Sequence, residues 1–223
     1  AKTLLNQQAQ QGGENVEQLL VTSLIDALWS KGHALEQLGE ESFAESCYKQ
    51  ILTKYDPDHV KSLNQLAQFY YKRATRRNQD GGDDDDDDEN SIQTKHAAAQ
   101  QAIEYLTQLD QVITETRPSN TGDFMDRVTI LFKKGMCQKL MGEYDSAVET
   151  FKTVQELKPS HYRSYVMRAT CLQKLCEEIP SLKEDSSFVL DIIDQYSAAI
   201  QILNNMLGKG YNNLATVKKS GTS

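Results

Sequence analysis

The sequence predicts an all-α protein built from repeated pairs of helices. Apolar residues recur three and four positions apart through most of the chain, which is the spacing of one face of a helix. Alternating runs of Val, Ile and Thr bounded by hairpin turns, the pattern of strands, are nearly absent. Two distant stretches also repeat the same order of small and aromatic residues, which indicates duplicated helix pairs.

The boundaries of the predicted helices follow from glycine and proline. Gly39 and Gly142 stand where helices end, because glycine readily adopts the left-handed backbone that closes a helix. The four prolines fall in or beside the breaks, where a missing N–H does least harm. Eight helices are expected, at about 15–38, 41–54, 59–77, 91–116, 123–140, 144–157, 161–177 and 186–208.

The net charge of −8 over 223 residues comes from one short run. Residues 80–90 contain eight acids and no base, and without them the chain has 24 acids against 24 bases. The folded part is therefore close to neutral, so a basic nucleic-acid-binding protein is disfavoured and no nucleic-acid partner is predicted. A wholly acidic disordered chain is also excluded, because the acid is not spread along the sequence.

The sequence predicts no membrane insertion and no secretion. Its most apolar segment, 19–29, is broken up by Thr22, Ser23 and Asp26, and the first residues lack the apolar core of a signal peptide. We therefore expect an intracellular protein, cytoplasmic or nuclear, whose four cysteines are reduced. The expected division is a flexible segment at 1–14, a helical domain at 15–208 and a flexible tail at 209–223. Inserts in the helical domain are expected at 78–90 and 177–186.

The duplicated stretches run from 30 to 52 and from 133 to 159. Each has a glycine, a second glycine seven residues later, an alanine five further on and an aromatic residue four beyond that. The two sets are Gly32, Gly39, Ala44 and Tyr48, and Gly135, Gly142, Ala147 and Phe151. The first glycine and the alanine would let two antiparallel helices approach closely, the second glycine would make the turn, and the aromatic ring would fill the space beyond.

This pattern resembles the tetratricopeptide repeat, a helix–turn–helix unit of 34 residues. The copy at 128–161 has that length and ends near Pro159, whereas the first copy has one extra residue before Pro57. Two weaker copies have Ala67 and Ala169 in the small-residue position, with long inserts before their second helices. The resemblance implies an α-solenoid of about four such repeats, two regular and two with inserts, and a last helix that caps the array. The alternative is an unrelated helical bundle with coincident spacings.

In the family that the chain resembles, the first helix of each repeat lines a concave groove that holds a partner peptide. Projecting these helices predicts a groove that combines large apolar groups with five bases and two acids, Asp26 and Glu36. Such a surface suits a peptide or helix with apolar and acidic residues. For Trp29, Phe132 and Met136 the alternative is packing against neighbouring helices. The predicted groove residues are Trp29, His33, Lys61, Asn64, Gln68, Tyr71, Lys72, Phe132, Met136, Lys139, Arg163, Val166, Thr170 and Lys174.

Catalysis is not expected, because the sequence contains no Gly-rich phosphate loop, no zinc-protease motif and no nucleophile elbow. The four histidines are scattered, so neither a metal site nor another cofactor is predicted. The sequence predicts an interaction scaffold, with a structural subunit of a larger assembly as the alternative. A co-chaperone-like or enzyme-regulatory module is a second alternative. The chaperone-tail clamp of the family is missing, because Trp29 and His33 occupy the places of its first Lys and Asn. The acidic run is expected to be either a solvated spacer or a strip that lies over the basic groove.

Overall fold

The computed structural model describes residues 2–76, 89–116 and 126–220, with side chains placed at 16–76, 89–115 and 126–208. Over these ranges the chain is helical and contains no strand, as predicted. The helices are α1 (Lys2–Gln37), α2 (Glu41–Lys54), α3 (Val60–Thr75), α4 (Glu89–Thr116), α5 (Arg127–Leu140), α6 (Tyr144–Leu157), α7 (Tyr162–Glu178) and α8 (Ser186–Ser220). A short 3-10 turn, η1 (Pro180–Lys183), joins the last two helices.

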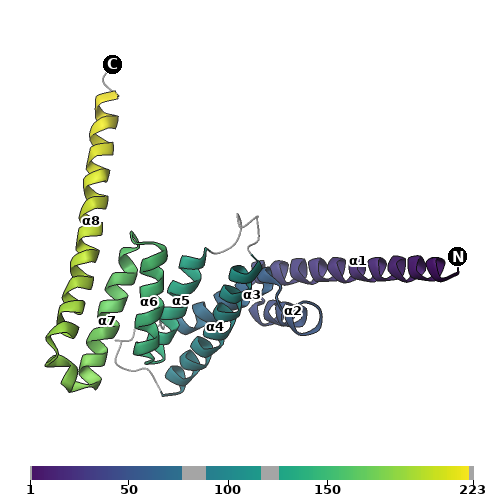
Figure 1. Cartoon of the computed structure of the whole chain (residues 1–223), viewed down its shortest axis with the longest axis horizontal. Coiled ribbons are helices and arrows are strands. Elements are labelled where there is room, and N and C mark those ends of the chain that lie inside the picture. The colour runs from purple at the N-terminus through teal and green to yellow at the C-terminus, as the bar shows by residue number, and fades with distance from the viewer. Residues whose placement is uncertain (1, 77–88, 117–125, 221–223) are drawn as a thin grey trace.

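Each helix packs on the next one along the chain, from α1 to α8. The first helices of successive pairs also touch, α3 against α5 and α5 against α7. Figure 1 shows the result as a row of helices with α1 extending away at one end and α8 standing at the other. The predicted array of four helix pairs is therefore confirmed, and the two termini lie at opposite ends of the molecule.

The glycines of the two regular repeats act as the sequence predicts. Gly39 and Gly142 have φ angles of +82° and +76°, so the left-handed backbone of both tight turns requires a residue without a Cβ. A Cβ added to Gly32 would lie 2.8 Å from the ring of Tyr48, and one added to Gly135 would lie 2.7 Å from the ring of Phe151. Direct contact between helix backbone and aromatic ring therefore sets the close approach within each pair.

The core follows the row of helices in two clusters. The first joins Tyr48, Leu63 and Leu66 to Leu106 and Ile130, and so spans α2 to α5. The second joins Phe151 of α6 to Cys171 and Leu172 of α7, with Phe188 and Ile192 of α8 packed on it. All four cysteines are free and buried. Because each cluster links neighbouring helices, the array is held together by contacts between successive repeats.

The helix ends match the prediction within a few residues except at the two termini. Here α1 begins at Lys2 and α8 continues to Ser220, beyond the predicted 15–38 and 186–208. The division of the chain into flexible ends and a helical domain stays a prediction. Residues 77–88, with most of the acidic run, and residues 117–125 lie outside the described ranges. Asp126 begins α5 by accepting a hydrogen bond from the Thr129 backbone N–H at 2.7 Å.

Three basic residues stand where the family that the chain resembles usually has Leu, namely Lys31, Lys134 and Arg168. Only the last has a clear structural role. The Arg168 side chain is 15% exposed and donates to Asp191 of α8 at 2.9 Å. Gln195 of α8 also donates to Asp191 and accepts from Gln155 of α6, at 2.8 and 2.9 Å. This polar network adds to the apolar packing of Phe188 and Ile192 where α8 joins the array.

Candidate functional site

The predicted groove residues come from four helices that succeed one another as first helices, α1, α3, α5 and α7. We call the side chains they contribute, together with Lys133 and Met167, the first-helix surface. The structure links these helices through specific side-chain contacts. Those contacts determine which predicted residues lie together and which are held in the core.

At the α1–α3 junction, Trp29 is a shared platform. Its ring stacks on His33 with a centroid separation of 5.3 Å, and Lys61 Nζ of α3 lies 5.0 Å from the ring centroid. Trp29 is half-buried and packs against the first core cluster. Trp29 therefore belongs both to the core and to the surface, because its side chain is half-buried while Lys61, which lies over its ring, is exposed.

At the α3–α5 junction, the ring of Tyr71 likewise lies beneath a lysine of the next first helix. Lys133 Nζ of α5 lies 5.2 Å from the Tyr71 ring centroid. Burial lowers the pKa of Lys133, and the neighbouring positive charge of Lys72 adds to the effect. Burial likewise raises the pKa of Tyr71. A negatively charged partner would stabilise the charged form of Lys133, because burial and the charge of Lys72 both disfavour that form.

At the α5–α7 junction, the aromatic residue is Phe132, and its ring contacts two other rings. Phe132 meets Phe151 at 5.6 Å and the edge of His161 at 4.9 Å between ring centroids. Phe132 and Met136 both pack against the second core cluster. Lys139 Nζ lies 4.0 Å from Met167 Sδ of α7. The packing alternative therefore describes Phe132 and Met136 best, although both remain partly exposed.

The remaining predicted residues divide by exposure. Lys61, Lys72, Arg163 and Lys174 are exposed, while His33, Asn64, Gln68, Lys139, Val166 and Thr170 are partly buried. Lys174 is held by Glu177 of its own helix at 2.6 Å, and the Thr170 hydroxyl donates to the Val166 carbonyl at 2.8 Å. Neither of these two therefore needs a partner from outside the chain.

Five cations of the first-helix surface have no ionic partner among the described residues. Lys61, Lys72, Lys133, Lys139 and Arg163 make no ion pair with any described residue. Elsewhere in the described chain, Arg73, Arg127 and Arg168 are each paired with a carboxylate, whereas lysines such as Lys54 and Lys152 are exposed and form no ion pair with described residues. The positive charge of this surface is thus left available, next to the rings of Trp29 and Tyr71.

Two residues of this surface, Lys133 and Met167, were missed by the sequence projection. The projection of α5 took Phe132 and Met136 and passed over Lys133, which follows Phe132 directly. Met167 lies next to Val166, which was predicted. A wider helical face would have included both, because a stripe that covers a groove spans more than one row of side chains.

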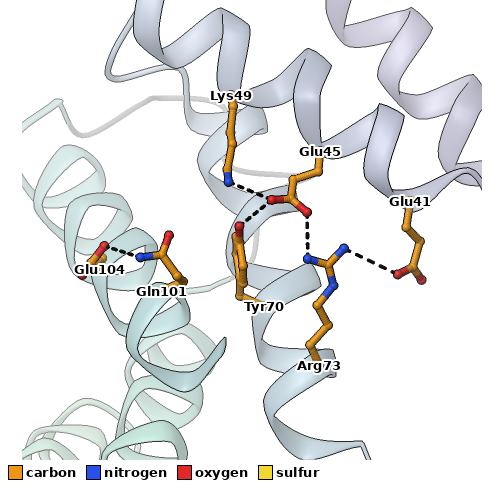
Figure 2. Close-up of polar contacts among 7 residues, drawn as sticks. All are labelled: Glu41, Glu45, Lys49, Tyr70, Arg73, Gln101 and Glu104. Atoms are coloured by element: carbon orange, nitrogen blue, oxygen red, sulfur yellow. Dashed lines mark hydrogen bonds and ion pairs between the residues drawn. The ribbon is translucent and has the colours of Figure 1, made fainter. Parts of the chain in front are cut away.

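A second polar cluster joins α2 to α3 and is fully satisfied (Figure 2). The Glu45 carboxylate accepts from Tyr70 Oη at 2.5 Å, Arg73 Nη1 at 2.7 Å and Lys49 Nζ at 2.8 Å. Burial alone would raise the pKa of Glu45, but the hydrogen bonds from Lys49, Tyr70 and Arg73 lower it to about 2. Because its charges are matched within the cluster, we assign it to holding the first two repeats together.

Other kinds of site are not seen in the described residues. No three His, Cys, Asp or Glu side chains gather there in a way that could hold a metal ion. None of the helices, over the same residues, combines the length and the apolar character needed to cross a bilayer. Burial raises the pKa of Cys137 to about 12 and that of Cys171 to about 11, which makes both thiols poor nucleophiles in the folded protein.

Comparison with known proteins gives one family match and distant structural neighbours. Residues 128–161 match a model of the tetratricopeptide repeat. No curated protein sequence matches the chain. Two crystal structures of MamA are similar at 15% and 16% identity, with TM-scores of 0.41 and 0.36. They cover 84% and 79% of this chain and 96% of MamA in each case.

A third neighbour is YrrB, described as a TPR protein with an unusual peptide-binding site, at 16% identity and a TM-score of 0.33. That match covers 83% of this chain and 90% of YrrB. The matched segment comprises α5, α6 and the turn between them, with the Gly135–Phe151 contact at its centre. The chain is therefore a protein that contains a tetratricopeptide repeat, within an all-α row of helix pairs.

Proposed function

We propose that this chain is a non-catalytic interaction module that binds an acidic peptide or helix along the first-helix surface. The observation that carries the proposal is a set of five cations that form no ion pair with the described residues, Lys61, Lys72, Lys133, Lys139 and Arg163. Two of them lie over aromatic rings, so a bound carboxylate would meet a cation and an apolar platform at the same place. Repeats of this type generally mediate protein–protein interaction, which agrees with the proposal.

The expected partner alternates acidic side chains with apolar anchors. The carboxylates would pair with the exposed cations, and apolar side chains would contact Trp29, Tyr71 and the half-buried Val166. Lys133 gives additional selectivity for acidic groups, because its lowered pKa means that its charge is unfavourable without a counter-charge. A basic peptide is expected to be rejected, since like charges facing each other in an interface are costly.

The test uses a displayed library of random peptides, because the natural partner is unidentified. Selection on the wild-type chain should enrich sequences that combine Asp or Glu with large apolar residues. Reversal of two exposed cations, Lys61→Glu with Arg163→Glu, should weaken the enriched peptides by about tenfold or more and flatten the salt dependence of binding.

The matched control is Lys54→Glu with Lys152→Glu. These lysines are exposed on the second helices α2 and α6 and form no ion pair with described residues. The control adds the same charge to the molecule, so its affinity should stay close to wild type. Equal loss of binding in both double variants, or enrichment of peptides without acids, would contradict the proposal.

A structural subunit of a larger assembly is the second candidate, and one observation favours it. Helix α1 exposes Val16, Leu19, Leu20 and Leu24, at 59%, 67%, 65% and 42% of their surface. An apolar row of this kind is typical of a face that another protein covers. Failure of the wild-type chain to enrich any peptide would favour this candidate over the groove.

A further inference from the structure

Three of the five cations that form no ion pair with described residues gather around one aromatic ring. Lys133 Nζ of α5 lies 5.2 Å from the Tyr71 ring centroid, and Lys72 follows Tyr71 directly in α3. Lys72 is close enough to Lys133 for its charge to lower the pKa of that lysine. Arg163 of α7 is close enough to Tyr71 to act on the pKa of its hydroxyl. We call Lys72, Lys133 and Arg163 the Tyr71 cluster.

Each member of the Tyr71 cluster comes from a different first helix. Helix α3 contacts α5, and α5 contacts α7, so the three charges come together only in the folded array. Lys72 and Arg163 are exposed, whereas Lys133 is partly buried beside the ring. The cluster therefore lies where a ligand can reach it, with one cation partly shielded from water and two in contact with it.

The described chain supplies no acid that balances the Tyr71 cluster. Apart from the cations, the group whose charge acts on both Lys133 and Tyr71 is Cys137. Cys137 is buried and has a pKa of about 12, so near neutral pH it is an uncharged thiol. No carboxylate of the described residues acts on either group. The three positive charges therefore repel one another until a ligand brings negative charge.

The other lysine–aromatic pair of the first-helix surface is different. At the α1–α3 junction, Lys61 is the one cation over the Trp29 ring in the described chain. An acid is also close by, because Glu36 Oε2 lies 3.9 Å from Nδ1 of His33, whose ring stacks on Trp29. A single cation near an acid requires little additional negative charge, whereas three cations without an acid require more than one carboxylate provides.

The number of charges and donors in the Tyr71 cluster indicates the class of ligand. A carboxylate carries one negative charge on two oxygens, so it would leave most of the positive charge of the cluster unbalanced. A phosphate monoester carries a charge of about −1.5 to −2 at pH 7 on three strong acceptor oxygens. It therefore offers one oxygen to each of the three cations. Hydrogen bonds between ionised partners of this kind are roughly twice as strong as neutral ones.

We propose that the Tyr71 cluster binds a phosphate monoester of the partner, carried by a phosphorylated side chain, with one oxygen toward each of Lys72, Lys133 and Arg163. This inference rests on the proposed function, because the phosphate belongs to the peptide that binds along the first-helix surface. It adds that one of the acidic groups of the peptide is a phosphate. Binding of the partner is then controlled by its phosphorylation.

The test compares three synthetic peptide libraries that differ only in one fixed central residue, which is phosphoserine, Glu or Ser. The flanking positions are random and enriched in Asp, Glu and large apolar residues. The affinity of the full chain for each fluorescent library is measured by anisotropy. The phosphoserine library should bind about tenfold or more tighter than the Glu library, and the Ser library should bind most weakly.

Two variants test whether the preference depends on the Tyr71 cluster. Arg163→Gln and Lys133→Met each remove one of the three cations, so each should reduce the affinity ratio of phosphoserine over Glu to near one. Arg163 is exposed, so its substitution should leave the helix content unchanged and decides the matter if Lys133→Met unfolds. The matched control is Lys61→Gln, which removes an exposed cation of the same surface outside the cluster. It should weaken both libraries and keep their ratio.

Each other outcome contradicts the phosphate assignment in its own way. Equal binding of the phosphoserine and Glu libraries overturns it and leaves the proposed function standing, because acidic peptides still bind. A ratio that survives Arg163→Gln, or that falls equally in Lys61→Gln, also overturns it, since the phosphate would then bind elsewhere. If none of the three libraries binds, the proposed function fails together with this inference.

Discussion

At the scale of single residues, the charged groups fall into two classes with opposite consequences. Glu45 and Arg73 are matched within a cluster, whereas Lys61 and Lys133 lie over aromatic rings and form no ion pair with a described residue. Matched charges in a half-buried position stabilise the fold, because removing one partner leaves the other unsatisfied. Unmatched charges add little to the fold and are free to bind a partner.

Glu45 gives a prediction about pH. Its folded pKa of about 2 is below its ordinary value of 4.5, so the unfolded chain binds the proton more tightly. Its contribution to stability is therefore present above about pH 4.5 and is lost as the pH falls toward 2. Glu45→Gln should lower the free energy of unfolding by roughly 1–3 kcal/mol at pH 7, with the difference shrinking through this window.

The measurement is urea unfolding of both chains between pH 7 and pH 3. Glu41→Gln is the matched control, because that side chain is 54% exposed and lies 3.9 Å from the same arginine. It should change stability by less than about 0.5 kcal/mol. A Glu45→Gln difference that stays constant with pH would show that packing, and not charge, is responsible.

Contacts between residues of one helix pair could be predicted from the sequence, whereas contacts between successive pairs could not. The glycine and aromatic positions of the two regular repeats were predicted and are confirmed, because the spacing within a helix pair is local. The partners of Lys133 and Met167 come from helices tens of residues away in the sequence, so the projection of one helix at a time missed both. The predicted groove residues stay a prediction.

At the scale of elements, the two helices of a repeat can approach closely because glycine lacks a Cβ atom at their contact. Phe151 is fully buried, so its ring cannot move aside for a Cβ at position 135. The same argument holds for Gly32 and Tyr48 in the first repeat. The small residue and the ring therefore determine the spacing between α5 and α6 together.

Gly135→Ala should lower the free energy of unfolding by roughly 1–2 kcal/mol. Overpacking a core position costs about 1–3 kcal/mol, and the higher helix propensity of alanine offsets up to about 1 kcal/mol of that cost. Gly208→Ala is the control, because that position is also helical and has nothing within 4 Å of the added atom. It should be neutral or slightly stabilising in the same urea titration. Equal effects at the two positions would refute the contact argument.

The element boundaries were predictable where glycine and proline punctuate the chain. Helices α2 and α6 begin and end at the predicted residues, since Gly39 and Gly142 determine the turns before them. The two terminal helices are longer than predicted. Gly12 and Gly13 lie close to the predicted start of the first helix, and Gly208 and Gly210 lie close to the predicted end of the last one, but the helical backbone continues through all four.

At the scale of the whole molecule, each repeat contacts only its neighbours. Repeats at the ends of such a row have a neighbour on one side only, so they open more easily than those in the middle. The four buried cysteines report on this directly, because they are distributed among α2, α5 and α7.

Alkylation of the native chain should therefore be slow and ordered. Cys137 of α5 lies in the middle of the row and should react last, after Cys47 of α2 and Cys176 of α7. All four thiols should react rapidly in denaturant. Mass spectrometry of the digested protein after timed labelling gives each rate. A single common rate for all four cysteines would show that the array opens only as one unit.

The sequence by itself determined the helix class, the pairing of helices and the turns, because these depend on periodicity and on residues a few positions apart. Only the tertiary structure decided which polar groups are satisfied. Arg168 of α7 pairs with Asp191 of α8, while Lys61 and Lys133 lie over aromatic rings and pair with no acid in the described part of the chain. The tertiary structure also decided which apolar side chains of α8 are buried and which are exposed, because only packing against α7 determines which part of that helix is covered.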